Sequence, residues 1–201
     1  MVQKEERRRG RPRSFDEGEV LEKARAVFWN LGYAATSLDD LARATGLNRP
    51  SLYGAFGDKH ALYLAALTRT RDEALASLGA ALSTEAPLKA VLTGLYGRAG
   101  AVYRAGDAGP RGCFIIGTAV TQALDDPEAR AVTAGFLAEM DRLFRERFER
   151  SAGELAKGLA PETAAPMASA ALHTLAIRAR AGADEAEMAA VAKAAVAALC
   201  G

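Results

Sequence analysis

The sequence is poor in histidine and cysteine. Only His60, His173, Cys113 and Cys200 occur in its 201 residues, too few and too far apart for a disulfide framework or a metal-ligand motif. A cysteine- or histidine-dependent hydrolase also lacks support, because no motif places a base and an orienting group around a nucleophile. We therefore expect no catalytic residue, no metal and no cofactor, with both thiols reduced.

Long apolar runs and alternating β-branched segments are also missing. No apolar run is long enough to span a membrane, and the basic N-terminus lacks the apolar segment of a secretory signal, which predicts a cytoplasmic protein with no membrane association. Half of the residues are hydrophobic, alanine and leucine dominate, and aromatic residues make up 6%. This composition predicts an all-α protein with one large or two small domains.

One stretch, residues 36–59, predicts two short helices joined by a tight turn, with a third helix starting behind them. Thr36 or Ser37 can cap the first helix, and Asp39 follows Thr36 at the spacing of a capping box. Gly46 permits the left-handed residue that ends this helix. The pattern is that of a helix-turn-helix, whose second helix fits the major groove of DNA.

The second of these helices has an unusual exposed face. Asn48 is its expected cap, Pro50 suits its first turn, and Leu52 and Phe56 point inward at i and i+4. Tyr53 has the alternative of packing at the edge of the core, but Leu52 and Phe56 already fill the inward face. The outward face lacks the Glu/Lys pairs of an ordinary surface helix and carries Arg49, Pro50, Ser51, Tyr53 and Gly54.

This arrangement resembles the DNA-binding domain of the TetR family of bacterial transcriptional regulators. The resemblance lies in Thr36, the GLNRPSLYGAF segment at 46–56, and Asp58-Lys59 followed by an apolar helix, and it covers about residues 14–74. It implies an all-α fold of about nine helices: a three-helix helix-turn-helix domain, then a helical bundle that dimerises through its last two long helices.

The resemblance also implies DNA-contacting residues. Thr36, Tyr53 and Lys59 would contact phosphates, which set register and affinity, whereas base contacts set sequence preference. Arg49, Pro50, Ser51 and Gly54 would face bases. The full set predicted to contact DNA is Arg9, Arg11, Thr36, Ser37, Arg49, Pro50, Ser51, Tyr53, Gly54 and Lys59.

A basic arm precedes this domain. Residues 1–13 hold six Lys or Arg and two Glu, a net charge of +4, so the remaining chain carries −3 of the total of +1. The Arg9-Gly10-Arg11-Pro12 segment can lie extended in a narrow A·T minor groove. A disordered solubilising tail is the alternative, and we favour the DNA role because the arm leads directly into the helix-turn-helix.

The remaining helices are predicted from apolar periodicity and Gly/Pro punctuation. A first helix over about 16–31 places Phe28 and Leu31 in the core and Trp29 at the edge of the domain. A fourth helix, opened by Asp58 and running to about Leu82, is long enough to bridge two domains. Further helices are expected over about 88–104, 113–124, 127–148, 162–181 and 184–199.

These patterns divide the chain into three parts. We expect a basic arm over 1–13, a helix-turn-helix domain over 14–74 with its reading unit at about 37–56, and a ligand-binding and dimerisation domain over 75–201. The last two helices are rich in alanine, which lets helices approach closely in a two-fold interface. Alanine helix propensity alone is the alternative explanation.

The ligand site is predicted only from apolar and aromatic stripes in the bundle. Cys113 begins a helix beside Arg111, where a sensor thiol is conceivable, but a small buried core residue is favoured. His173 is more often satisfied within such a bundle than a ligand contact. The candidate wall residues are Tyr96, Tyr103, Cys113, Phe114, Gln122, Phe136, Met140, Phe144 and His173.

The sequence thus predicts a homodimeric repressor that binds a palindromic operator in double-stranded DNA and is released by a small, largely apolar effector. Release is expected to be a population shift. The ligand binds best to a conformation in which the two helix-turn-helix domains of the dimer (the reading heads) have the wrong spacing for the operator, and this weakens DNA binding. A ligand-independent architectural DNA-binding protein that uses the basic arm is the alternative; it would coat DNA without a boundary.

Overall fold

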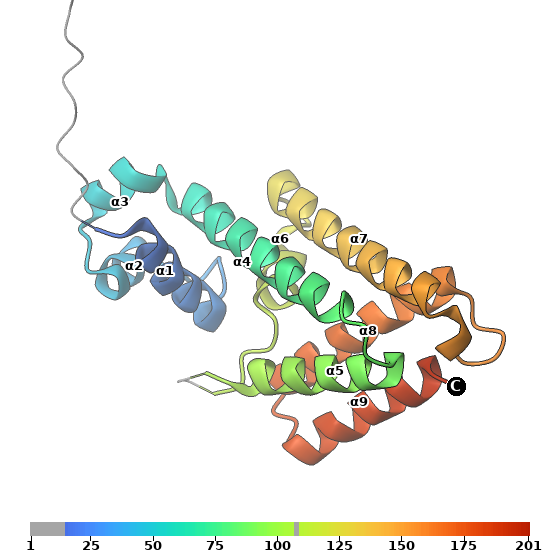
Figure 1. The fold of residues 1–201 in the computed structure, drawn as a ribbon. Coiled ribbons are helices and arrows are strands. Elements are labelled where there is room, and N and C mark those ends of the chain that lie inside the picture. The colour runs from blue at the N-terminus through green and yellow to red at the C-terminus, as the bar shows by residue number, and fades with distance from the viewer. Residues whose placement is uncertain (1–14, 107–108) are drawn as a thin grey trace, which may run out of the picture.

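The computed structural model describes residues 15–106 and 109–201, and its regular structure there is helical apart from an isolated antiparallel bridge between Leu155 and Cys200. This confirms the all-α prediction. A π-helical turn (Ile115–Ala119) and a 3₁₀ turn (Ala152–Glu154) accompany the α-helices (Figure 1). These are α1 (Glu17–Leu31), α2 (Leu38–Thr45), α3 (Arg49–Phe56), α4 (Lys59–Leu82), α5 (Leu88–Arg104), α6 (Val120–Gln122), α7 (Pro127–Arg150), α8 (Pro161–Arg180) and α9 (Glu185–Leu199).

The helices of the described residues form a small bundle and a larger one, which α4 connects (Figure 1). The small bundle of α1, α2 and α3 lies at one end of α4, and α4 continues from it alongside α7 into the larger bundle (Figure 1). There α8 packs against α7, α5 and α9. Across residues 15–106 and 109–201, no helix has both the length and the apolar character required to cross a membrane.

The helix ends of the first bundle follow local capping chemistry. Ser37 is the cap of α2 and forms a capping box with Asp40, which corrects the predicted pairing of Thr36 with Asp39. Gly46 ends α2 at φ 74°, in the left-handed region, as predicted. The side chain of Asn48 caps α3 by accepting from the backbone N–H of Ser51 at 2.9 Å. These caps fix the turn between α2 and α3, and hence the angle at which α3 is presented.

The core of this bundle differs from the prediction at one position. Phe28 is fully buried and contacts Tyr63 with ring centroids 5.1 Å apart, as expected for the inner face of α1. Leu31 was predicted in the core, but its side chain is 50% exposed. It is the last residue of α1, and Gly32 turns the chain away at φ 79°, so no neighbouring helix covers it.

The segment predicted as a helix over 113–124 is a π-helical turn followed by the short α6. Gly117 lies in this turn against the guanidinium of Arg180, where a Cβ would be only 2.9 Å from Nη1. The hydroxyl of Thr118 donates to the carbonyl of Phe114 and lies 3.0 Å from the Tyr63 hydroxyl of α4. The segment at the π-helical turn therefore contacts both α4 and α8.

Candidate nucleic-acid interface and effector cavity

The exposed face of α3 is the candidate reading surface. Leu52 is 3% exposed and anchors the helix, while Tyr53 on the opposite side is 48% exposed. The predicted Arg49, Pro50 and Gly54 are also exposed, and Ser51 is half-buried. Asn48 is exposed too; sequence reasoning assigned it only a capping role.

Arg49 is held by a carboxylate of the preceding helix. Its Nε donates to Oδ1 of Asp39 at 2.9 Å and its Nη2 donates to Oδ2 at 2.6 Å. The hydrogen bond and the charge of Arg49 hold the pKa of Asp39 below its ordinary value. Both side chains are more than half exposed, at 55% and 62%, so water screens the pair. A guanine can replace such a screened carboxylate as the bidentate partner of Arg49.

Gly54 leaves α3 without a side chain at the centre of this face. A Cβ built at this position meets no other atom within 4 Å, so the glycine is not required by packing within the protein. It is a position where a DNA backbone or base edge can come close to the helix axis.

Two of the residues predicted to contact DNA, Thr36 and Ser37, use their hydroxyls within the protein. Thr36 is only 2% exposed and its hydroxyl donates to the carbonyl of Gly32 at 2.6 Å, so its side chain is engaged within the protein. Ser37 is exposed, but its hydroxyl donates to Oδ2 of Asp40 at 2.6 Å. These hydroxyls stabilise the turn that leads into α2.

Lys59 holds the same turn from the other side. Its ammonium donates to the carbonyls of Tyr33 and Thr36 at 3.0 and 2.9 Å and lies 4.4 Å from the centroid of the Tyr33 ring. Two of the three donors of the ammonium are therefore used within the protein. The predicted residues Arg9 and Arg11 lie outside the described residues.

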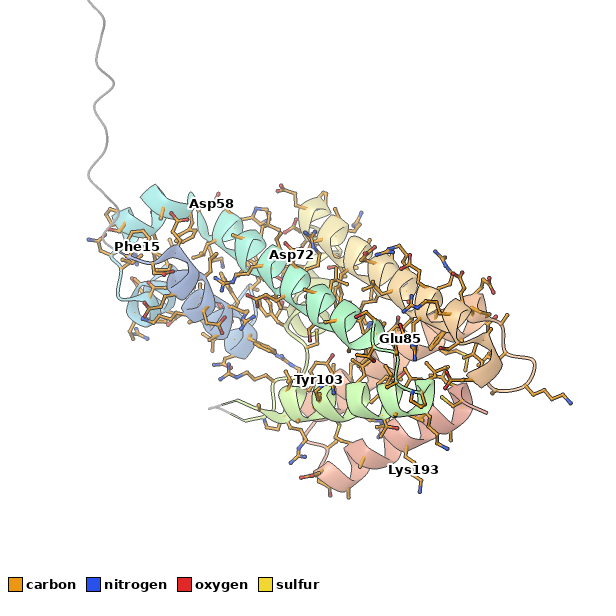
Figure 2. The ribbon with its side chains drawn as sticks, in the orientation of Figure 1. Phe15, Asp58, Asp72, Glu85, Tyr103 and Lys193 are labelled. Carbon is orange, nitrogen blue, oxygen red and sulfur yellow. The ribbon has the colours of Figure 1, made fainter. Side chains whose placement is uncertain are left out.

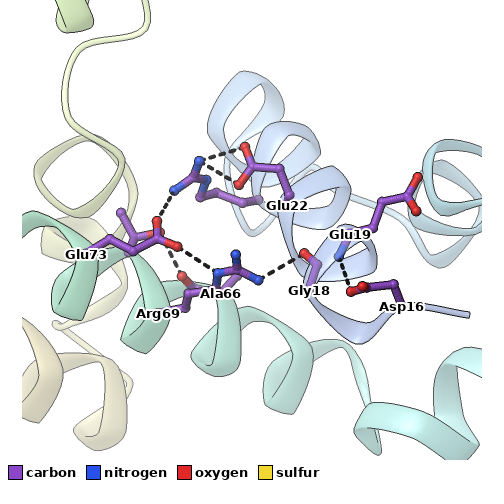
Figure 3. Close-up of polar contacts among 9 residues, drawn as sticks. Asp16, Gly18, Glu19, Glu22, Ala66, Arg69 and Glu73 are labelled. Atoms are coloured by element: carbon purple, nitrogen blue, oxygen red, sulfur yellow. Dashed lines mark hydrogen bonds and ion pairs between the residues drawn. The ribbon is translucent and has the colours of Figure 1, made fainter.

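Salt bridges tie α1 to α4 (Figure 3). Arg25 contacts Glu22 at 2.6 Å and Glu73 at 3.1 Å. Arg69 donates from Nε to Glu73 at 2.8 Å and from Nη1 to the carbonyl of Gly18 at 3.0 Å. The network therefore holds the first turn and the middle of α1 against one face of α4.

The start of α4 is joined to the start of α7. His60 Nε2 lies 2.7 Å from Oδ2 of Asp126, and Nδ1 lies 3.8 Å from Glu128. Asp126 also caps α7, since its Oδ1 accepts from two backbone N–H groups at 3.0 Å. Within the described part of the chain these three residues form the one group whose metal-type ligand atoms lie within 4.8 Å of one another. The sequence hides this group because His60 is far from the other two along the chain.

A second set of contacts, made by Trp29, connects α1 to the larger bundle. The Trp29 indole N–H donates to the carbonyl of Arg111 at 3.1 Å, and its ring lies 5.8 Å from that of Phe114. Arg180 at the end of α8 donates to the same Arg111 carbonyl at 3.2 Å. Trp29, expected at the edge of its domain, thus contacts the segment that follows α5 and lies beside the end of α8.

A cavity of about 550 Å³ lies between α4, α5, α7 and α8. Of the nine predicted wall residues, Tyr103, Phe136 and Met140 line it. The others in its wall are small or aliphatic, apart from Ser77 and Arg98. They are Ala74, Leu78, Ala80, Ala81, Leu95, Ala99, Val102 and Leu172.

The remaining predicted wall residues lie elsewhere. Tyr96 is fully buried and its hydroxyl donates to the carbonyl of Ala168 at 3.2 Å. Phe114 packs against Trp29, and Phe144 packs against Phe148. These aromatic side chains are core residues, because periodicity marks the buried face of a helix without distinguishing filled space from a hollow.

Gln122 and His173 are also absent from the cavity wall. Gln122 is half-buried in α6. His173 is half-buried in α8, and burial lowers the pKa of its imidazole, so it is neutral at pH 7. Its Nε2 is buried and has no hydrogen-bond partner in the part of the chain that the structure describes, which differs from the satisfied histidine expected from the sequence.

Cys113 lies in a separate hollow of about 320 Å³ beside α8, together with Gly117 and Arg180. Burial raises the pKa of its thiol, the opposite of what a nucleophilic thiolate requires. The helix N-terminus and the nearby arginine therefore do not activate this cysteine in the described conformation.

Comparison with known proteins agrees with this arrangement. Residues 20–66, which span α2, α3 and parts of α1 and α4, match the family described as bacterial regulatory proteins, tetR family. A solved structure of a cysteine-substituted form of the TetR family transcriptional regulator CifR, complexed with 26-bp double-strand operator DNA, is 32% identical. The match covers 94% of this chain and 99% of that chain, with a TM-score of 0.80.

Curated relatives match over a shorter part. The HTH-type transcriptional repressor ComR of Escherichia coli K12 is 38% identical over 118 residues, 58% of this chain and 56% of ComR. The HTH-type transcriptional activator FasR of Mycolicibacterium smegmatis is 39% identical over 73 residues, 36% of this chain and 33% of FasR. The chain thus spans little more than half the length of ComR and a third of FasR.

Proposed function

Since this chain belongs to the TetR family of bacterial transcriptional regulators, we propose that it is a homodimeric repressor that binds a palindromic operator and is released by a small molecule. Because the members of this family are DNA-binding regulators, we propose no enzymatic activity for this chain. The observation that carries the proposal is the outward face of α3, which is exposed, lacks acidic residues and belongs to a helix with hydrogen-bonded caps at both ends.

In the proposed complex, α3 enters the major groove and α2 crosses the backbone. Arg49, Pro50, Ser51 and Gly54 face bases, and Tyr53 contacts a phosphate with its exposed hydroxyl end. Lys59 and Thr36 act through the turn that they hold, and the arm with Arg9 and Arg11 follows the minor groove. CifR, at 32% identity, is a regulator of this family in complex with operator DNA, which supports this placement.

The proposed dimer forms through α8 and α9. Met167 and Ile177 on α8 are 42% and 59% exposed, and they lie on the same side as exposed Ala170 and Thr174. The outward side of α9 carries Lys193 among small residues, which permit close helix approach: Ala186, Ala189, Ala190, Ala194 and Ala197. Pairing with a second copy covers these apolar side chains and places two α3 helices on a dyad.

The proposed effector site is the 550 Å³ cavity, a volume within the usual range for small-molecule sites. Its wall includes Ala74, Ser77 and Leu78 of α4, the helix whose first half carries the small bundle. A ligand that fits better when α4 has shifted therefore favours a conformation with altered spacing of the two reading heads. The uninterrupted course of α4 across the proposed domain boundary at residue 74 supports this transmission.

Fluorescence anisotropy with DNA from the region next to the gene tests the proposal. Tyr53→Ala is expected to weaken binding to most sequences, because a phosphate contact carries no sequence information. Arg49→Ala is expected to relax preference at one base pair, with a loss of about 1–3 kcal/mol at the preferred base. Lys157→Ala, an exposed cation on the far loop, is the matched control and is expected to bind as the wild type does. Unchanged binding by both α3 variants would exclude this reading face.

A further inference from the structure

The cavity wall combines apolar side chains with a small group of hydrogen-bond donors. Ten of its thirteen residues are apolar, and the polar ones are Ser77 on α4 with Arg98 and Tyr103 on α5. Aspartate and glutamate are absent from the described residues that line it. The cavity therefore has one positive charge and no negative charge in its wall.

Arg98 is the only arginine without a polar partner in the part of the chain that the structure describes. Its neighbours in the fold are paired: Arg104 with Glu185 at 3.2 Å, and Arg178 with Glu187. Arg98 folds back along α5, where a Cβ at Gly94 would lie 3.2 Å from its Nη1. Within residues 15–106 and 109–201 no carboxylate or carbonyl accepts from this guanidinium. Arg98 is exposed and belongs to the cavity wall, so its donor fork is free to turn to a ligand anion.

Two hydroxyl groups accompany it. Neither the Tyr103 phenol, placed along α5 in Figure 2, nor the Ser77 hydroxyl makes a hydrogen bond within residues 15–106 and 109–201. Burial raises the pKa of Tyr103, so its phenol keeps its proton and can donate. The hydroxyl of Ser77, on α4, can donate as well. The wall thus offers a ligand hydrogen-bond donors from both α4 and α5.

We infer that the effector is an anionic amphiphile: a carboxylate that pairs with Arg98, carried on an apolar body that fills the aliphatic part of the cavity. This inference rests on the proposed role of the cavity as the effector site. A single planar guanidinium fork matches a planar carboxylate in a bidentate pair, whereas a phosphate dianion requires a second cation that the wall does not supply. The ten apolar wall residues match an alkyl or aryl body.

In this proposal the ligand contacts polar groups on two different helices of the cavity wall. Its carboxylate pairs with α5 through Arg98, and its remaining oxygen lone pairs face Ser77 of α4. A bound carboxylate therefore bridges α5 to the helix that carries the reading head. An uncharged ligand of the same shape fills the apolar wall without making this bridge.

Calorimetric titration with decanoate, decan-1-ol and decyltrimethylammonium, each below its micelle concentration, tests the inference because the three probes share an alkyl chain and differ in head group. Decanoate is expected to bind about tenfold or more tightly than decan-1-ol, and decyltrimethylammonium most weakly. Arg98→Gln is expected to remove the preference for decanoate while leaving decan-1-ol unchanged, and Arg98→Lys to retain part of it. Arg145→Gln, on an exposed ion pair of α7, is the control and keeps the preference.

Equal affinity for decanoate and decan-1-ol, full decanoate affinity in Arg98→Gln, or no binding of any probe would overturn the inference. The proposed function is tested separately, by gel shift of the operator with ligand-free protein and then with decanoate. A wild-type protein that binds decanoate through Arg98 but keeps its operator complex would refute the effector role of the cavity and leave the ligand chemistry standing.

Discussion

Replacing Lys59 with methionine separates a positioning role from a phosphate contact. In the structure its ammonium makes two hydrogen bonds to carbonyls and a cation–π contact with Tyr33. Each charged hydrogen bond contributes about 1.5–3 kcal/mol and the cation–π contact about 0.5–1. Ordering the lysine side chain costs up to about 2 kcal/mol. With values near the lower ends, because Lys59 is only half-buried, and with the full ordering cost, the net contribution is about 1.5 kcal/mol.

Thermal unfolding measures this contribution. For a chain of this length, a loss of about 1.5 kcal/mol lowers Tm by about 3–6 °C, and we expect Lys59→Met to show such a fall. Lys157→Met is the control and is expected to unfold at the wild-type temperature. The salt dependence of operator binding tests the alternative, a phosphate contact. If Lys59→Met keeps the wild-type Tm, while the slope of the logarithm of the DNA-binding constant against the logarithm of salt concentration becomes shallower by about 0.9, Lys59 contacts a phosphate and the reasoning is refuted.

Three further predictions concern the reading face, the dimer and the thiol. Gly54→Leu is expected to leave Tm near the wild-type value, since a Cβ there meets nothing, yet to abolish operator binding in anisotropy; retained binding would place the DNA elsewhere. Ile177→Glu is expected to give a monomer in sedimentation analysis because it puts a charge on the proposed interface, whereas an unchanged dimer would exclude this face of α8. Cys113 is expected to react with iodoacetamide far more slowly than free cysteine at pH 7.5, since burial raises the pKa of its thiol; rapid labelling of folded protein would contradict the burial.

The fold was largely predictable where structure depends on local sequence. The Asn48 cap and the Gly46 turn define α2 and α3 within the chain itself, and both positions are as expected. The π-helical turn at 115–119 was not predicted; it lies against Arg180 of α8, a neighbour that is distant in the sequence and that local patterns do not reveal. Leu31 was wrongly predicted in the core, because apolar periodicity does not show where along a helix its inner face stops packing against other helices.

The candidate sites were predictable to different depths. Sequence reasoning identified the exposed side of α3, but it missed that Asp39 of α2 holds Arg49 and that Lys59 is bonded to the turn before α2. Such partners lie ten or more residues away, and only the packing of the helices brings them together. The cavity was located less well, since Phe136 and Phe144 share one stripe of α7 while only Phe136 borders the hollow.

Hydroxyl-radical footprinting of the ligand-free protein on DNA next to its gene tests the central claim most directly. The account predicts two protected half-sites on one face of the duplex, related by a dyad and one helical turn or a whole multiple of it apart, and it predicts their loss with Tyr53→Ala. Protection without a boundary, or a single unpaired half-site, would contradict a dimer that reads DNA through α3.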